Sequence, residues 1–213
     1  ASTYSSKVFY INTTTDTITH RMDTGEVHSH MIALTPDEET VYVPNIGSDS
    51  ITVVSAQARE IVGRIPVGNG PEGVAVHPNG KWLYVANQHD NTLFFLDAVS
   101  NELLWKRRIG SCPIRVVFSP DGQYALIPNR ESGDLSVVLT EQTLNGETRP
   151  WEIKRIPVGK WPGGTVFNRL GTYAYVANNK TNDVSIIDMM TLKEVGRIDV
   201  GIHPDGMALL VKA

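Results

Sequence analysis

One pattern recurs about every 42 residues along this chain of 213 residues. Three markers follow the period independently: a proline in a tight turn, an asparagine that closes a strand, and a glycine that ends each unit. They stand at Pro36, Pro78 and Pro120; at Asn45, Asn87, Asn129 and Asn178; and at Gly25, Gly68, Gly110, Gly159 and Gly201. A repeat of this length constrains the fold more strongly than composition does.

One spacing departs from the period. Asn129 and Asn178 lie 49 residues apart, and so do Gly110 and Gly159, so a single insertion of seven residues explains both shifts. The insertion falls within residues 140–151 and contains Asn145-Gly146, a strong turn signal. We therefore expect a surface loop between the third and fourth strands of one unit, and no domain boundary.

Each unit contains four short apolar or β-branched segments separated by turn signals, which is typical of strands. In one unit they are residues 74–76, 83–85, 93–96 and a segment starting at residue 103. The fourth segment carries a basic residue four places before each terminal glycine, which suits an exposed edge strand. These basic residues are Arg21, Arg64, Lys106, Arg155 and Arg197. Four-stranded units of about 40–45 residues predict an all-β propeller of antiparallel blades, with the first strand innermost.

We interpret the chain as a single propeller domain, residues 1–213, that is five-bladed if the chain is complete. Complete blades are predicted at residues 26–68, 69–110, 111–159 and 160–201. Residues 1–25 correspond to the third and fourth strands of a split blade, and residues 202–213 to its first strand. That blade lacks a second strand, so the alternative is a fragment of a longer propeller, for example one of seven blades.

The repeat resembles that of a known family. Tyr84-Val85-Ala86-Asn87 and Tyr175-Val176-Ala177-Asn178, followed by residues 184–188 and Val200-Gly201, are similar to the YVTN β-propeller repeat. The resemblance covers nearly the whole chain and implies a cell-surface or periplasmic protein, hence a periplasmic or extracellular location. More distant relatives implied by it include lactonases and copper or quinone oxidoreductases.

Composition excludes some classes of function. The formal net charge is −4, whereas a nucleic-acid surface normally needs clustered lysine and arginine, so no nucleic-acid partner is expected. No apolar run approaches the roughly 18 residues that span a bilayer, so no transmembrane segment is expected. The single cysteine, Cys112, allows no internal disulfide.

Equivalent positions of the units predict where a site would lie. In an antiparallel blade, the connection into the first strand shares a face with the turn between the second and third strands. Aligning the units places His28, Gly70, Cys112, Trp161 and His203 in one slot at the start of the first strand. Two residues later, on the same side of an extended strand, come His30, Glu72, Ile114, Gly163 and Asp205. We expect these slots to meet at the mouth of a central channel.

The channel mouth carries the chemistry that the sequence predicts. Imidazole and carboxylate groups together suit zinc or copper, and they could also supply a general base for opening an activated ester. The candidate metal ligands are His28, His30, His203, Glu72 and Asp205. Ordinary polar residues beside channel water would give the same pattern. We favour that interpretation because no familiar metal spacing is present, and we assign no catalytic residue.

Other residues on this face vary between units, as ligand contacts on a fixed scaffold do. We predict a ligand-binding face that contains Cys112, Arg115, Trp161, His89, Glu131 and Lys180, with Arg130 among the varying positions. Trp161 could stack against a sugar or another ring. Arg115 could bind an anion or pair with Glu72.

Two functional hypotheses remain open. The first is a non-enzymatic binding or interaction module that takes a small molecule or a protein at the channel-mouth face. The alternative is a metal-assisted enzyme, a lactonase-like hydrolase or a copper oxidoreductase, with its site at the channel mouth. No cofactor is firmly predicted, and zinc and copper are the candidates. The chain has no GxSxG elbow, phosphate-binding glycine loop, dinucleotide fingerprint or HExxH motif.

Overall fold

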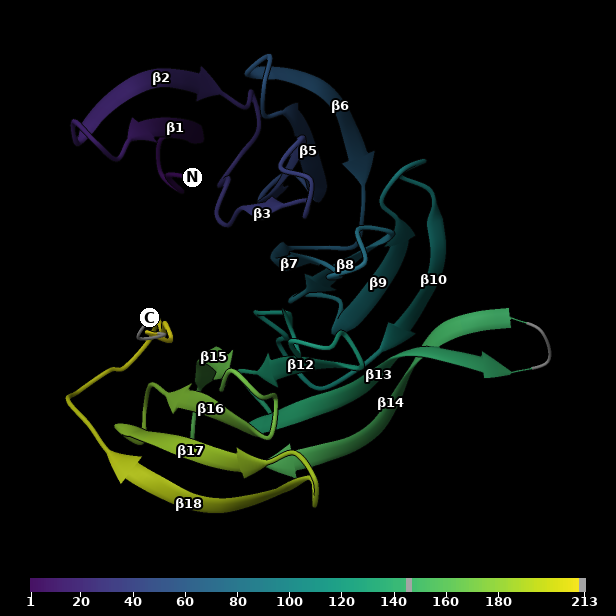
Figure 1. Cartoon of the computed structure of the whole chain (residues 1–213), viewed down its shortest axis with the longest axis vertical. Helices are drawn as coiled ribbons and strands as arrows, with labels where there is room; N and C mark the ends of the chain where they lie inside the picture. The colour runs from purple at the N-terminus through teal and green to yellow at the C-terminus, as the bar shows by residue number, and fades with distance from the viewer. Residues whose placement is uncertain (145–146, 211–213) are drawn as a thin grey trace.

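The structure, a computed structural model, describes residues 1–144 and 147–210. The regular elements that it describes are all β-strands, and they form one two-stranded and four four-stranded antiparallel sheets. Figure 1 shows these sheets arranged around a common centre. The all-β propeller with four-stranded antiparallel blades is therefore confirmed.

The sheets follow the chain in order, and we number the four-stranded ones as blades 1 to 4. The two-stranded first sheet pairs β1 (Lys7–Asn12) with β2 (Thr17–Asp23). Blade 1 contains β3 (Ala33–Leu34), β4 (Thr40–Asn45), β5 (Ser50–Ser55) and β6 (Glu60–Pro66). Blade 2 contains β7 (Pro71–Val76), β8 (Trp82–Asn87), β9 (Thr92–Asp97) and β10 (Leu103–Arg108). Blade 3 contains β11 (Val117–Phe118), β12 (Tyr124–Asn129), β13 (Asp134–Leu144) and β14 (Glu147–Pro157). Blade 4 contains β15 (Pro162–Phe167), β16 (Tyr173–Asn178), β17 (Asp183–Asp188) and β18 (Lys193–Asp199).

Within each blade the strands pair in chain order, so the first and fourth strands form the edges. Figure 1 shows the fourth strands β6, β10, β14 and β18 on the outside. The segment 201–210 contains no strand, and residues 211–213 lie outside the described residues. The split blade and the five-bladed ring stay predictions.

The seven-residue insertion lengthens two strands, and the expectation of a surface loop was wrong. β13 and β14 contain 11 residues each, and their pairing continues through Gln142 opposite Arg149. Figure 1 shows this hairpin extending beside β10. The Arg107 guanidinium of β10 lies 4.5 Å from the centre of the Trp151 ring of β14. Continued backbone pairing and this cation–π contact explain the ordered hairpin. The expected turn at Asn145-Gly146 lies outside the described residues.

The recurring asparagine and glycine have one structural cause, because they touch each other. Asn129 is fully buried, and its Nδ2 donates to Asp134 Oδ1 (2.6 Å) and Ser136 Oγ (2.8 Å) on the next strand. A Cβ on Gly110 would overlap the Asn129 side chain. The pairs Gly68 with Asn87 and Gly159 with Asn178 repeat this contact. Blades 2, 3 and 4 therefore need both residues, since a side chain on the glycine would displace the buried amide.

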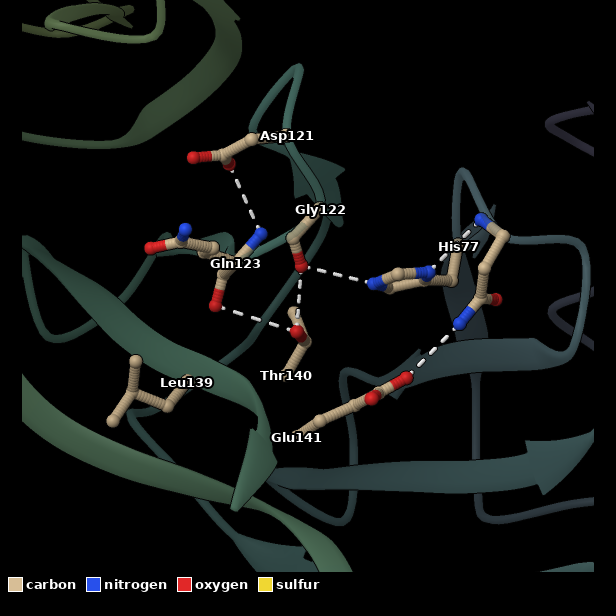
Figure 2. A pocket seen from close by; sticks show the side chains of 8 residues that line it. His77, Asp121, Gly122, Gln123, Leu139, Thr140 and Glu141 are labelled. Carbon is tan, nitrogen blue, oxygen red and sulfur yellow. Dashed lines mark hydrogen bonds between the residues drawn. The ribbon is translucent and has the colours of Figure 1, made fainter.

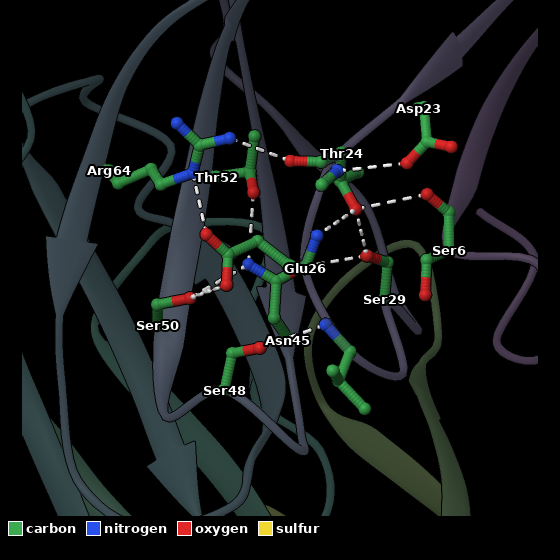
Figure 3. Close-up of polar contacts among 12 residues, drawn as sticks. Ser6, Asp23, Thr24, Glu26, Ser29, Asn45, Ser48, Ser50, Thr52 and Arg64 are labelled. Carbon is green, nitrogen blue, oxygen red and sulfur yellow. Dashed lines mark hydrogen bonds and ion pairs between the residues drawn. The ribbon is translucent and has the colours of Figure 1, made fainter.

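Arg64, the basic residue of the outer strand β6, links blade 1 to the segment that follows the first sheet, as Figure 3 shows. Its Nε lies 2.6 Å from Glu26 Oε1, and its Nη2 donates to the carbonyl oxygen of Thr24 at 2.8 Å. Ser29 Oγ donates to Asn45 Oδ1 at 2.7 Å in the same network. These contacts tie the segment after β2 to blade 1.

Tyrosine hydroxyls link neighbouring blades across their interfaces. Tyr42 of blade 1 donates to the carbonyl oxygen of Ala98, and Tyr84 of blade 2 donates to that of Thr140, both at 2.7 Å. Burial raises the pKa of Tyr42 to about 12 and raises the pKa of Tyr84 as well. In blade 3 the equivalent residue is Leu126, which packs in one core cluster with Met189 of blade 4. Apolar packing replaces the hydrogen bond at that interface.

We predict that Tyr84→Phe lowers the free energy of unfolding by about 1–3 kcal/mol, because it leaves the buried carbonyl of Thr140 without this donor. Urea denaturation followed by tryptophan fluorescence measures the loss. The matched control is Tyr173→Phe, since Tyr173 is 40% exposed and its hydroxyl makes no hydrogen bond within residues 1–144 and 147–210. Equal effects of the two changes would contradict an inter-blade role for Tyr84.

Candidate functional site

The residues of the first predicted slot share one backbone conformation. His28, Gly70, Cys112, Trp161 and His203 all have φ between 56° and 64°, in the left-handed region. Three of their N–H groups are held by the preceding blade: Gly70 donates to Asp49 Oδ1 (2.8 Å), Cys112 to Asn91 Oδ1 (2.8 Å) and His203 to Asn182 Oδ1 (3.0 Å). These bonds fix the point at which the chain enters each blade.

The slot three residues later forms the hub of the molecule, where segments from different blades meet. Its members are Met31, Gly73, Arg115, Gly164 and Gly206. A Cβ on Gly73 would lie 2.8 Å from the backbone of Arg115, and one on Gly164 would overlap the carbonyl oxygen of Asp205. Neighbouring segments therefore approach too closely for a side chain at Gly73 or Gly164.

Arg115 is the one long polar side chain of that slot, and it reaches across the hub. Its Nη1 lies 2.8 Å from Met31 Sδ of blade 1, and its Nη2 lies 3.9 Å from Asp205 Oδ1. A cavity of 240 Å³ lies beside it, lined by Met31, Arg115, Val116, Val117, Gly164, Thr165, Gly206 and Met207. Segments that are far apart in sequence thus line one central space.

A buried carboxyl group faces this hub. Glu72 is only 5% exposed, and its Oε1 lies 3.5 Å from Arg130 Nη2. Burial raises the pKa of Glu72, and the nearby positive charges of Arg130 and Arg115 oppose that rise. Pairing with Glu72 was one of two roles considered for Arg115, and the structure gives Arg130, from the turn after β12, as the ion-pair partner of Glu72.

His30 adds a second titratable group to the hub. Burial lowers the pKa of its imidazole, and the positive charge of Arg115 lowers it further. Its Nδ1 is buried and has no hydrogen-bond partner within the described part of the chain. A neutral imidazole with an unoccupied nitrogen therefore accompanies Glu72, Arg115 and Arg130.

Trp161 and two cations border a smaller pocket at the rim. Lys180 Nζ lies 3.5 Å from the centre of the Trp161 ring, and the Arg130 guanidinium lies 5.6 Å from it. The pocket measures 150 Å³ and is lined by Ile114, Arg130, Trp161, Gly163, Asn179 and Asp205. Since ligand sites usually measure about 300–1,000 Å³, it suits a small polar molecule or one end of a larger one.

The other predicted residues lie around this centre. Cys112 Sγ lies 3.8 Å from Gln88 Oε1, and burial raises the pKa of its thiol, which disfavours the nucleophilic thiolate. His28, His89 and Glu131 are exposed. His203 is also exposed, and its Nδ1 lies 3.2 Å from Asn179 Oδ1.

The predicted metal ligands do not form a recognisable donor set. Among residues 1–144 and 147–210, no three histidine, cysteine, aspartate or glutamate side chains are grouped to hold a metal ion. His30 and Glu72 border the hub, but Arg115 and Arg130 place positive charge beside them. The zinc or copper site stays a prediction.

Sequence comparison places the chain in a family. The family model described as "Lactonase, 7-bladed beta-propeller" matches residues 5–198. The chain belongs to this lactonase family. Comparison with curated proteins gave no match. Within the described residues, the structure has no helix that is long and apolar enough to cross a membrane.

Solved structures similar to this lactonase-family chain show the fold but differ in function. The periplasmic gluconolactonase of Pseudomonas aeruginosa has a TM-score of 0.68 and 20% identity, over 84% of this chain and 55% of that one. The hydrazine synthase of Kuenenia stuttgartiensis has a TM-score of 0.70 and 22% identity, over 79% of this chain and 47% of that one. A functionally unknown protein from Desulfotomaculum acetoxidans has a TM-score of 0.84 and 14% identity, over 96% of this chain and 66% of that one. This chain thus covers less than two thirds of each.

Proposed function

We propose that the hub is the active site of a hydrolase that opens small lactones. The observation that supports this most is the convergence of two guanidinium groups, Arg115 and Arg130, with a buried carboxyl group whose pKa is raised, Glu72. Opening a lactone requires a base to take a proton from water and hydrogen-bond donors for the oxyanion. The hub supplies both, and membership of the lactonase family agrees with this chemistry.

Each residue then has a stated task. Glu72, as the carboxylate, accepts a proton from the water that attacks the lactone carbonyl carbon. Arg115 and Arg130 donate hydrogen bonds to the carbonyl oxygen while negative charge develops on it. The ester C–O bond breaks, the proton passes to the departing ring oxygen, and the product is an open-chain hydroxy acid. His30, with its unoccupied Nδ1, provides a second acceptor beside the water.

We propose a sugar lactone as the substrate class and the periplasm as the location. The structural relative from Pseudomonas aeruginosa is a periplasmic gluconolactonase, which supports both proposals. Lys180 beside Trp161 at the rim offers a donor for sugar hydroxyl groups. The YVTN-type repeat suggested by residues 84–87 and 175–178 agrees with a location in the cell envelope.

The test is hydrolysis of glucono-1,5-lactone by the purified chain, followed by base uptake in a pH-stat and compared with the spontaneous rate. The reaction is repeated with and without EDTA, and binding of gluconate is measured by calorimetry. We expect acceleration over the spontaneous reaction. Gluconate binding at the hub without any acceleration would overturn the hydrolase proposal and favour a non-enzymatic binding module.

The pH dependence follows from the raised pKa of Glu72. Its carboxylate is the active form, so kcat/KM should fall as pH decreases through that pKa. This acid limb should lie above the pH expected for an exposed glutamate, whose pKa is about 4.3. Arg130→Met removes a charge that lowers this pKa, so the limb should move to higher pH. Arg107→Met, on β10, is the control and should leave the limb unchanged. A limb that does not move in Arg130→Met would contradict the role of Glu72.

A further inference from the structure

Two crevices occupy equivalent places in the repeat, away from the hub. One measures 390 Å³, lies between blades 2 and 3, and is lined by His77, Asn79, Asp121, Gly122, Gln123, Leu139, Thr140 and Glu141. The other measures 460 Å³, lies between blades 3 and 4, and is lined by Tyr124, Gly171, Thr172, Tyr173, Asp188, Met189 and Met190. Glu141 and Met190 hold the same repeat position, as do Gly122 and Gly171.

The crevice between blades 2 and 3 is bridged by its own side chains (Figure 2). Glu141 Oε1 accepts hydrogen bonds from Asn79 Nδ2 (2.9 Å) and Trp82 Nε1 (2.5 Å) of the preceding blade. His77 Nε2 lies 2.9 Å from the carbonyl oxygen of Gly122. Several polar side chains of this crevice are therefore already used in hydrogen bonds that join the two blades.

The crevice between blades 3 and 4 lacks this bridge. Met190 replaces Glu141 and is 92% exposed, and Tyr124 stands where blade 2 has Trp82. Tyr124 of β12 and Tyr173 of β16 supply aromatic walls from two adjacent blades. With Met189 and Met190, they make the lining largely apolar and adaptable.

Asp188 gives this crevice its charge. Its Oδ1 accepts hydrogen bonds from the N–H groups of Met190 (2.8 Å) and Thr191 (2.9 Å), which hold the carboxylate in place. Within the described part of the chain it forms no ion pair, although Lys193 stands opposite it in the register of β17 and β18. One carboxylate with no ion-pair partner among the described residues thus borders an apolar crevice with two tyrosine rings.

We propose that this crevice binds a small organic cation of the quaternary ammonium or methylated amine class. The faces of aromatic rings attract such cations, and the carboxylate of Asp188 complements their charge. Methionine side chains fit around methyl groups. The volume lies within the range of about 300–1,000 Å³ usual for small-molecule sites. This site is separate from the hub and does not depend on the proposed lactonase activity.

Choline and its neutral isostere 3,3-dimethylbutan-1-ol are the probes. The chain has five methionines, and 13C-labelled methionine methyl groups report on the crevice by NMR. Choline should shift the Met189 and Met190 methyl signals. The neutral alcohol should bind about tenfold more weakly, the ratio that corresponds to about 1.4 kcal/mol. No shift of these two signals at saturating choline would overturn the proposal.

Asp188→Asn removes the charge and keeps the oxygen that holds the turn, so it should lower choline affinity about tenfold, to that of the neutral alcohol. Tyr173→Ala removes one aromatic wall at an exposed position and should also weaken binding. Asp121→Asn, in the other crevice, is the matched control and should leave binding unchanged. Choline affinity that is equal in Asp188→Asn and the wild type would overturn the proposal.

Discussion

Replacing Glu72 with glutamine should lower kcat/KM for glucono-1,5-lactone by about 10²–10⁴-fold, the usual contribution of general acid–base catalysis. Glutamine keeps the size of the side chain and an oxygen for Arg130, which lies 3.5 Å away in the wild type. It cannot accept the proton from water. The effect should therefore fall on kcat, with a smaller change in KM. Initial rates in the pH-stat measure both.

The control for this change is Glu102→Gln, which removes an exposed carboxylate just before β10, outside the predicted ligand-binding face. Its kcat/KM should match that of the wild type. Circular dichroism and urea denaturation show whether each variant is folded. If folded Glu72→Gln retains full activity, Glu72 is not the base, and the proposed assignment of roles is wrong.

Replacing Gly73 with alanine should lower the free energy of unfolding by about 1–3 kcal/mol, the usual cost of overpacking. The added Cβ would lie 2.8–2.9 Å from the backbone N, Cα and C atoms of Arg115. Backbone atoms cannot turn aside as the end of a side chain can, so the first strands of blades 2 and 3 would have to separate. Urea denaturation measures the loss, and lactone hydrolysis should fall with it because Arg115 would move.

The control is Gly206→Ala, at the same position of the repeat. Nothing lies within 4 Å of a Cβ built there, so its stability should stay within about 0.5 kcal/mol of the wild type. A loss in Gly206→Ala as large as that in Gly73→Ala would mean that the close approach at Gly73 is not the cause.

The repeat made the fold predictable, because most local contacts recur from blade to blade. The recurrence of Asn129 and Gly110, for example, reflects one buried amide packed against a position without a side chain. The long hairpin of β13 and β14 was not predicted. The spacing of the recurring asparagine and glycine shows that residues are inserted, but it does not show whether the inserted residues form strand pairs. Pairing at Gln142 and Arg149 and the contact of Trp151 with Arg107 decide that outcome.

The site was only partly predictable. Alignment of the units put His28, Trp161 and His203 in one slot of the repeat, and in the structure these residues share a left-handed backbone conformation. However, the inference that residues two apart share a side assumes an extended chain, and a φ near 57° breaks that alternation. The metal-ligand set that included both His28 and His30 relied on this assumption.

The partners of the hub arginines depend on contacts that spacing does not reveal. Gly73 and Gly164 flank Arg115 in its slot and allow close packing there, so its guanidinium reaches Met31. Arg130 follows the recurring Asn129, which places it on the correct face, but only side-chain geometry shows that it pairs with Glu72.

A crystal structure of the chain with gluconate, the product of the proposed reaction, tests the central claim most directly. The carboxylate of gluconate should lie within about 3 Å of guanidinium nitrogens of Arg115 and Arg130, the usual length of a charge-assisted hydrogen bond. Glu72 should lie beside its carboxyl carbon. Gluconate bound away from the hub, with Arg115 still against Met31 and Arg130 still against Glu72, would contradict a lactone site at the hub.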